Sequence, residues 1–94
     1  MLDAIRELLV TEAAVEKLGA RGISLEHAQQ LLRNANVMVR NPRGDGQVVR
    51  RLLIGRTDGS RALTLVIERT LDPGTWLLVT GWDASAGERR ILGD

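Results

Sequence analysis

The chain has 94 residues, with 13 Lys and Arg against 12 Asp and Glu, which gives a formal net charge of +1. A chain of this length forms one domain around a single core, so we expect residues 1–94 to be one domain. The chain has no cysteine and one histidine, which disfavours thiolate and histidine metal sites, and we expect neither a metal nor a cofactor.

The sequence shows no sign of a membrane segment. No stretch reaches the ~18 consecutive apolar residues of a transmembrane helix. The N-terminal segment MLDAIRELLVTEAAVEKL lacks the basic start and small-residue cleavage site of a signal peptide. We therefore expect a soluble, cytoplasmic protein with no membrane partner.

The positive charges are concentrated in the middle of the chain. Residues 40–61 hold six arginines and two aspartates, or +4, whereas residues 1–33 sum to −1 and residues 62–94 to −2. Lys17 is the single lysine, and the planar guanidinium of arginine suits phosphate. Codon bias in a GC-rich genome accounts for much of the choice of arginine over lysine but not for the clustering, so charge alone leaves a polyanionic partner open.

The first third of the chain predicts a strand and two helices. Residues 5–10 form a short apolar stretch that suits a strand, although the same residues also suit a helix. Thr11 is placed to cap a helix over residues 11–22, with Gly19 or Gly22 at its end. Ser24 caps a second helix over residues 24–34, whose leucines recur at helical spacing.

The rest of the chain predicts four strands and a closing helix. Strands are expected over residues 35–40, 47–56, 61–70 and 75–82, separated by the turns NPRGDG, TDGS and LDPG. TDGS is interpreted as a tight turn of the Asp-Gly type. Because the connections are short, the strands should pair antiparallel. The segment 61–70 is apolar on both faces, so it should be central in the sheet, and residues 84–92 should form a helix.

This order of elements predicts an α+β fold. We expect a small antiparallel sheet of four to five strands, with the two N-terminal helices packed on one face and a short C-terminal helix. Such an arrangement satisfies the rule that a sheet buries its apolar face against another layer.

Two polar candidates have a structural interpretation beside a functional one. His27 is the only histidine and a candidate general base, but a half-buried helix position without catalytic role is favoured. Ser85 and Glu88 have the S-x-x-E spacing of a capping box, which predicts a helix start rather than a reactive pair.

The arginines beside the TDGS turn and one tryptophan are candidates for contact with nucleic acid. Arg56 and Arg61 flank this turn and could hold a phosphate between them, but arginines beside a turn are also ordinary solvated residues. Trp82, at the end of the last strand, could stack on a base, although packing is favoured.

Common catalytic motifs are missing from the sequence. It contains no P-loop, no G-x-G-x-x-G, no H-E-x-x-H and no serine nucleophile motif, which disfavours a nucleotide- or metal-dependent enzyme. RNA cleavage without a metal remains open. In that reaction the 2′-hydroxyl attacks its own phosphate, and the protein supplies position and charge stabilisation.

Four strings along the chain resemble one protein family. These are EKLGARGISLEHA at residues 16–28, RRLLIGRTDGSR at 50–61, LTLVIERT at 63–70 and VTGWDASAGERRIL at 79–92. In this order and spacing they resemble the BrnT-like toxins of type II toxin–antitoxin systems, within the RelE-like superfamily. The resemblance covers nearly the whole chain, although each motif alone is weak.

The resemblance implies ribosome-independent RNA endonuclease activity, without a metal, that arrests growth. It implies a cognate antitoxin that neutralises the toxin, and binding of promoter DNA only through that antitoxin. The positions that it offers for catalysis are Arg56, Arg61, Glu68, Arg21 and Arg89. Contacts to the RNA substrate are assigned to Arg50, Arg51, Trp82 and Arg90.

The chain departs from the family at two places. Arg21 replaces a histidine that often precedes the glycine of the first turn, and Trp82 with Asp83 replaces a basic pair. These departures leave open a catalytically degenerate relative that binds an antitoxin or a nucleic acid. A nucleic-acid-binding module unrelated to toxins is a third interpretation.

Overall fold

The computed structural model describes residues 5–40 and 49–93, and these ranges hold five strands and three helices. In chain order the elements are β1 (Glu7–Leu9), α1 (Glu12–Gly19), α2 (Leu25–Arg33), β2 (Asn36–Arg40), β3 (Arg50–Arg56), β4 (Ala62–Arg69), β5 (Thr75–Asp83) and α3 (Ala86–Ile91). The predicted NPRGDG turn lies outside the described residues. The α+β prediction is confirmed.

One mixed sheet holds all five described strands, in the order β1-β5-β4-β3-β2. The antiparallel meander from β2 to β5 is confirmed, and β4 lies in the middle as its two apolar faces predicted. The purely antiparallel expectation is wrong for β1, which pairs parallel with β5. The reason is that α1 and α2 carry the chain to the opposite edge, and the meander returns to β1 from that side. A parallel pair needs such a long connection.

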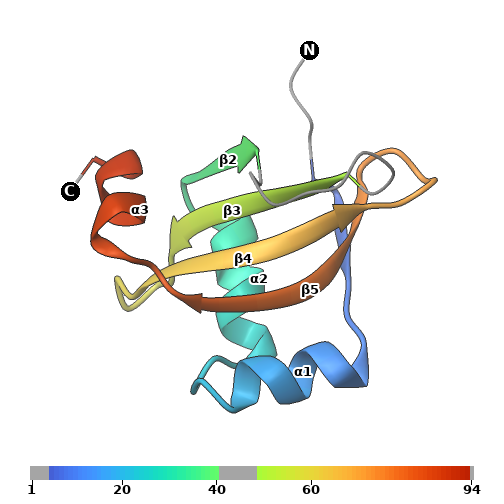
Figure 1. Cartoon of the computed structure of the whole chain (residues 1–94), viewed down its shortest axis with the longest axis horizontal. Coiled ribbons are helices and arrows are strands. Elements are labelled where there is room, and N and C mark those ends of the chain that lie inside the picture. Colours follow the sequence, from blue (N-terminus) through green and yellow to red (C-terminus); the bar gives the residue numbers. More distant parts are fainter. Residues whose placement is uncertain (1–4, 41–48, 94) are drawn as a thin grey trace.

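Both N-terminal helices lie on one face of the sheet, with α2 crossing behind β3 and β4 in Figure 1. Their buried residues join the strands in one core cluster, in which Leu18 and Leu31 meet Leu53 and Leu65. The apolar residues of α2 fall on a single stripe of the helix, which explains this packing. The prediction that both helices cover the same face is confirmed.

The opposite face of the sheet is called the open face. Ile54, Thr64 and Val66 alternate with the core residues of β3 and β4 and therefore point to this side. They are buried, although they are not part of the helix-facing cluster. In Figure 1 the short helix α3 lies at one end of this face. The rest of the open face has no helix over it in the described part of the chain.

Side-chain caps fix the starts of the three helices. The Thr11 hydroxyl accepts a hydrogen bond from the Ala14 amide at 3.2 Å, as predicted. Ser24 caps α2, and its capping box is completed by His27, whose Nδ1 accepts from the Ser24 amide at 3.1 Å. The predicted capping box of α3 is confirmed between Ser85 and Glu88. No described helix is long and apolar enough to cross a membrane.

The TDGS turn has a different geometry from the one expected. The residue with left-handed backbone conformation is Ser60, at φ 70°, and not a glycine. The Thr57 amide donates to the Arg61 carbonyl at 2.9 Å, and the Ser60 amide donates to the Thr57 carbonyl at 2.9 Å. The hairpin loop therefore has three residues, Asp58 to Ser60, rather than a two-residue Asp-Gly turn.

Gly81 lies where β5 packs closely against Leu18 of α1. A Cβ at this position would lie 2.7 Å from Leu65 Cδ2 and 2.9 Å from Leu18 Cδ2, both in the core. We predict that Gly81→Ala lowers the free energy of unfolding by about 1–3 kcal/mol, because the core has to move to accept the methyl group. Urea denaturation followed by tryptophan fluorescence measures this. The matched control is Gly19→Ala, where nothing lies within 4 Å of the added carbon.

Candidate functional site

The predicted site residues fall at opposite ends of the sheet. We call the end where β3 stops, β4 begins and β5 stops the hairpin end, and the other end the far end. Arg56, Arg61, Trp82 and the residues of α3 lie at the hairpin end, whereas Arg50, Arg51 and Glu68 lie at the far end. Glu68 is seven residues along β4 from Arg61, which corresponds to roughly 23 Å at about 3.3 Å per residue.

The far end holds an ion pair across two strands. Arg50 and Glu68 are directly opposite in the register of β3 and β4, and Arg50 Nε lies 3.1 Å from Glu68 Oε1. Arg51 Nη1 donates to the Arg50 carbonyl at 3.1 Å. The structure therefore does not bring Glu68 together with Arg56 or Arg61, and one phosphate cannot contact all three side chains.

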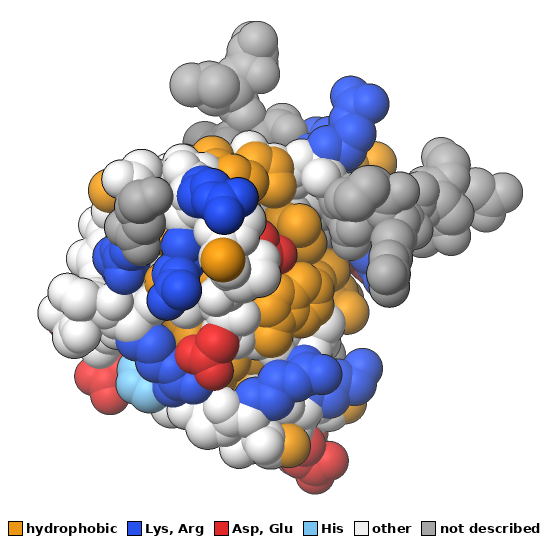
Figure 2. All heavy atoms as spheres, turned by 60° about the vertical axis from the view of Figure 1, so that its left-hand side comes forward, with side chains coloured by type: hydrophobic (Ala, Val, Ile, Leu, Met, Phe, Trp, Pro, Cys, Tyr) orange, Lys and Arg blue, Asp and Glu red, His pale blue; other side chains and the backbone are white. Residues whose placement is uncertain are grey.

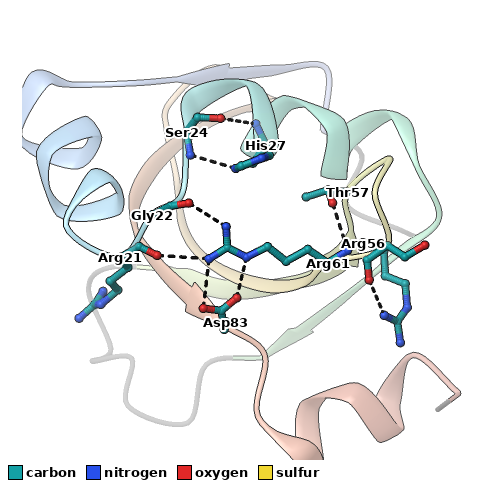
Figure 3. A network of polar contacts seen from close by, with 9 residues as sticks. Arg21, Gly22, Ser24, His27, Arg56, Thr57, Arg61 and Asp83 are labelled. Carbon is teal, nitrogen blue, oxygen red and sulfur yellow. Dashed lines mark hydrogen bonds and ion pairs between the residues drawn. The ribbon is translucent and has the colours of Figure 1, made fainter.

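Arg61 forms a network that we call the clasp, shown in Figure 3. Its Nε and Nη2 bind the two carboxylate oxygens of Asp83 at 2.7 and 3.1 Å. Nη1 donates to the Gly22 carbonyl at 2.7 Å, and Nη2 donates to the Arg21 carbonyl at 3.2 Å. The hydrogen bonds from Arg61 hold the pKa of Asp83 below its ordinary value. Arg61 thus joins the β3–β4 hairpin to the end of β5 and to the turn between α1 and α2.

Arg56 points away from the clasp. Its position is close to that of Arg61 in the hairpin, but in Figure 3 the two guanidinium groups diverge from the shared turn. Arg56 Nη1 donates to the Ser60 carbonyl at 2.8 Å, and the side chain lies on the open face beyond Ile54. The two arginines therefore do not form a shared phosphate clamp.

Arg21 reaches the outer edge of β5. Its Nη1 donates to the Gly81 carbonyl at 2.8 Å and to the Thr80 hydroxyl at 3.1 Å. The described part of β1 pairs only with Thr75 to Leu77, so this stretch of β5 has no neighbouring strand on that side. Arg21 satisfies one carbonyl there and places a largely exposed guanidinium beside the strand end that carries Trp82.

Glu88 connects the last strand to α3 through its carboxylate. Oε1 accepts from the Ser85 amide at 2.8 Å and from Trp82 Nε1 at 3.1 Å. The buried Thr64 hydroxyl faces this carboxylate without completing a hydrogen bond of standard geometry. Burial alone would raise the pKa of Glu88, but hydrogen bonds from Ser85 and Trp82 and the nearby Thr64 hydroxyl outweigh it, so the pKa is lowered. Glu88 is therefore an anion at neutral pH.

Arg89 and Arg90 complete the hairpin end. Both are exposed on α3, and neither makes a side-chain hydrogen bond or ion pair with the residues that the structure describes. Figure 2 shows hydrophobic side chains in a continuous strip, with Lys and Arg side chains to either side of it. The hairpin end thus combines exposed guanidinium groups with a half-buried indole, Trp82.

A groove of about 520 Å³ lies beside this end, between the start of β2, the β3–β4 hairpin and the end of α3. Its lining residues are Asn34, Ala35, Asn36, Val37, Arg56, Thr57, Asp58 and Leu92. Asn34 Nδ2 donates to Asp58 Oδ1 at 3.0 Å and to the Arg56 carbonyl at 2.9 Å. The groove therefore offers side-chain oxygen acceptors beside one arginine.

This arrangement is suited to binding an anionic polymer. Guanidinium groups donate to phosphate oxygens, and an indole at the end of a sheet offers a stacking surface. The site is less suited to proton transfer, because the carboxylates of Asp83 and Glu88 have lowered pKa values and are therefore weak bases. His27 lies elsewhere, with Nδ1 engaged in the cap of α2. Among the described residues, no three His, Cys, Asp or Glu side chains lie together as metal ligands would.

Sequence reasoning missed two parts of this site. The S-x-x-E spacing identified Glu88 as a capping residue, but its bond to Trp82 Nε1 depends on how α3 folds back over β5. The groove joins residues 34–37 to residues 56–58 and 92, and no local pattern links these segments.

The contacts of the clasp predict that Arg61 contributes to the free energy of unfolding. We predict that Arg61→Lys lowers the free energy of unfolding by about 1–2 kcal/mol, because an ammonium group cannot reach Asp83 and both carbonyls together. The control is Arg33→Lys, whose exposed pair with Asp58 is a single contact of 3.5 Å and should change stability by less than about 0.5 kcal/mol. Chemical denaturation of both variants gives the comparison, and equal effects would contradict the assignment.

The lowered pKa of Glu88 predicts a pH dependence. A carboxyl group whose pKa is lower in the folded chain stabilises the fold above its unfolded pKa of about 4.3, and this contribution is lost as the pH falls through the folded value. We predict that wild-type stability falls more steeply between about pH 5 and pH 3 than that of Glu88→Gln.

The matched control for this pH series is Glu16→Gln on the exposed surface of α1. Asp83, whose pKa is also lowered, is present in all three proteins, so the difference isolates Glu88. Parallel stability curves for wild type and Glu88→Gln would contradict the predicted role of the carboxylate.

No protein-family model, curated protein or solved structure matches this chain. The resemblance to BrnT-like toxins therefore remains an interpretation of the sequence strings. Any assignment of function has to be argued from the geometry of the hairpin end.

Proposed function

We propose that the chain is a BrnT-like toxin of a type II toxin–antitoxin system that binds and cleaves RNA at the hairpin end of the open face. The observation that carries the proposal is that Arg21, Arg56, Arg89 and Arg90 lie at the same end of the sheet as Trp82. Guanidinium groups and an aromatic surface at one end suit a single-stranded RNA, whose phosphates and bases they can contact together.

The proposed reaction needs no metal. The 2′-oxygen of one nucleotide forms a bond to its own 3′-phosphorus while the bond to the 5′-oxygen of the next nucleotide breaks. The 2′-hydroxyl loses a proton and the departing 5′-oxygen gains one, which leaves a 2′,3′-cyclic phosphate and a 5′-hydroxyl end. Arginines lower the barrier by stabilising the charge that grows on the phosphate oxygens.

We assign the arginines to three roles according to their positions. Arg56 and Arg89 are assigned to the reacting phosphate, and Arg21 at the β5 edge to the developing charge. Arg90, Arg50 and Arg51 are assigned to phosphates farther along the RNA, since the latter two lie at the far end. Arg61 is reassigned to holding the site together, because four of its N–H contacts are with Asp83, Gly22 and Arg21.

A second candidate function is binding without cleavage. Asp83 and Glu88, two carboxylates of the hairpin end, both have lowered pKa values and accept protons poorly. Glu68, the one carboxylate among the positions expected for catalysis, is held by Arg50 at the far end. These observations favour a catalytically degenerate toxin fold that binds an antitoxin or a nucleic acid.

The proposed partners follow from the toxin assignment. They are an RNA substrate and a cognate antitoxin that neutralises the chain, with promoter DNA bound only through that antitoxin. The proposed compartment is the cytoplasm, where RNA and antitoxin are both present. The basic hairpin end is the surface that an inhibitor would have to cover.

The test compares cleavage and binding on the same purified proteins. We predict that wild type converts a labelled single-stranded RNA, in excess EDTA, to fragments with 2′,3′-cyclic phosphate ends. The double variant Arg56→Ala, Arg89→Ala should lower the cleavage rate by at least about 100-fold, since each lost phosphate contact removes transition-state stabilisation. The control Lys17→Ala removes one exposed positive charge from α1 and should cleave like wild type.

Three results separate the candidates. Cleavage that disappears in the double variant supports the nuclease. RNA or antitoxin binding without cleavage at any protein excess supports the degenerate fold. Cleavage that is unchanged in the folded double variant would contradict the assignment of the hairpin end.

A further inference from the structure

In the described chain, β1 and the outer stretch of β5 have features that hinder pairing with a further strand. β1 is only three residues long, and Arg6 beside it donates to the Pro73 carbonyl. The outer stretch of β5 is occupied by Arg21, which bonds to the Gly81 carbonyl and the Thr80 hydroxyl. Short edges and charged side chains laid along an edge are the usual ways in which proteins prevent a further strand from adding.

At the edge of β2 no described side chain is bonded along the strand, although the exposed Arg40 ends it. β2 runs from Asn36 to Arg40, pairs with β3 on one side, and has no strand on its other side among the described residues. An antiparallel strand directs every second N–H and C=O away from its neighbour, so β2 turns backbone groups to a side where no described strand pairs with them. Its middle residues, Val37, Met38 and Val39, are half-buried and apolar, and the strand contains no proline or lysine.

We propose that β2 pairs antiparallel with β2 of a second copy of this chain, about a two-fold axis at Met38. The two five-stranded sheets then form one continuous sheet. In this register Met38 lies opposite Met38 of the second copy, and Val37 lies opposite Val39. Asn36 lies opposite Arg40, so no two like charges face each other directly.

The ends of the paired strands are complementary in charge. Each Arg40 arrives beside Asn36 of the other copy, at the mouth of the 520 Å³ groove that Asn34 and Asp58 also line. Asp58 has a side chain that is 58% exposed, and its contact to Arg33 is 3.5 Å long. The Asp58 carboxylate also accepts from Asn34 Nδ2 at 3.0 Å, and its exposed oxygens can accept a further hydrogen bond from Arg40 of the second copy. A two-fold axis repeats this contact at the other end of the pair.

The expected dimer is reversible. A pair of five-residue edges is a small contact beside the roughly 1,200–2,000 Å² of a standard interface. The half-buried valines of β2 add to it, because Val37 and Val39 of both copies become neighbours on the open face. We therefore expect the fraction of dimer to rise with concentration over a measurable range.

Sedimentation equilibrium on the full chain, over a range of about 1 µM to 1 mM, tests the association. Wild type should show a monomer–dimer equilibrium. Arg40→Asp and Asp58→Arg should each weaken association at least about tenfold, because each places like charges at both ends of the pair. An equimolar mixture of the two variants should associate as tightly as wild type, because both contacts are then complementary.

A cysteine at the axis tests the register. The chain has no cysteine, so Met38→Cys introduces a single thiol. Opposite residues in antiparallel strands have Cα atoms about 4.5–5.5 Å apart, which suits a disulfide. Met38→Cys should form a disulfide-linked dimer under mild oxidation much faster than Val15→Cys, a control with an exposed position on α1.

Opposite outcomes would overturn the proposal. A wild-type chain that stays monomeric across the whole range, or a variant mixture that associates no better than either variant alone, excludes this interface. Equal rates of cross-linking for Met38→Cys and Val15→Cys exclude the register. Because none of these measurements involves RNA, their failure is separate from any failure of the nuclease assignment.

Discussion

The structure depends on the central strand β4, which is apolar on both of its faces. Leu63, Leu65 and Ile67 point to the helices, while Thr64 and Val66 point to the open face, and all five are buried. A strand of this kind has to be covered on both sides. The two N-terminal helices cover one side, but the only described helix near the other side is the six-residue α3. The partial cover leaves an apolar strip with arginines beside it, and this asymmetry creates the candidate site.

The charge of the sequence segments did not predict which arginines are engaged in internal contacts. Arg61 belongs to the basic middle of the chain, and its position beside a turn suggested phosphate. In the structure Arg61 connects three segments, because most of its N–H groups donate to Asp83 and to two carbonyls of the α1–α2 turn. Arg50 is engaged in a similar way by Glu68. Arg89 and Arg90 on α3 and Arg21 at the β5 edge are exposed, and all three lie outside the basic segment of the sequence.

The features that sequence predicted well are local. Thr11, Ser24 and Ser85 were recognised as caps because each bonds to a residue three positions away. The two apolar faces of β4 required only the alternation of a strand.

The features that sequence reasoning missed are long-range or conformational. The parallel pairing of β1 with β5 depends on the path of the whole chain, and the roughly 23 Å between Arg61 and Glu68 follows from their places on one strand. The left-handed conformation of Ser60 was not predicted, because the neighbouring Gly59 is the residue type that adopts this conformation most readily.

The attachment of α3 has a consequence for local unfolding. This helix has no buried residue, and its described contacts with the sheet include the bonds of one carboxylate, that of Glu88. Segments with little buried apolar surface open at a lower free energy than the global transition. We therefore expect α3 to open at a lower free energy than the helix-facing core, and its opening would expose the part of β3 that it contacts and the Thr64 hydroxyl near Glu88. A partner that binds α3 when it is detached from the sheet would contact a hydrophobic surface that α3 otherwise covers.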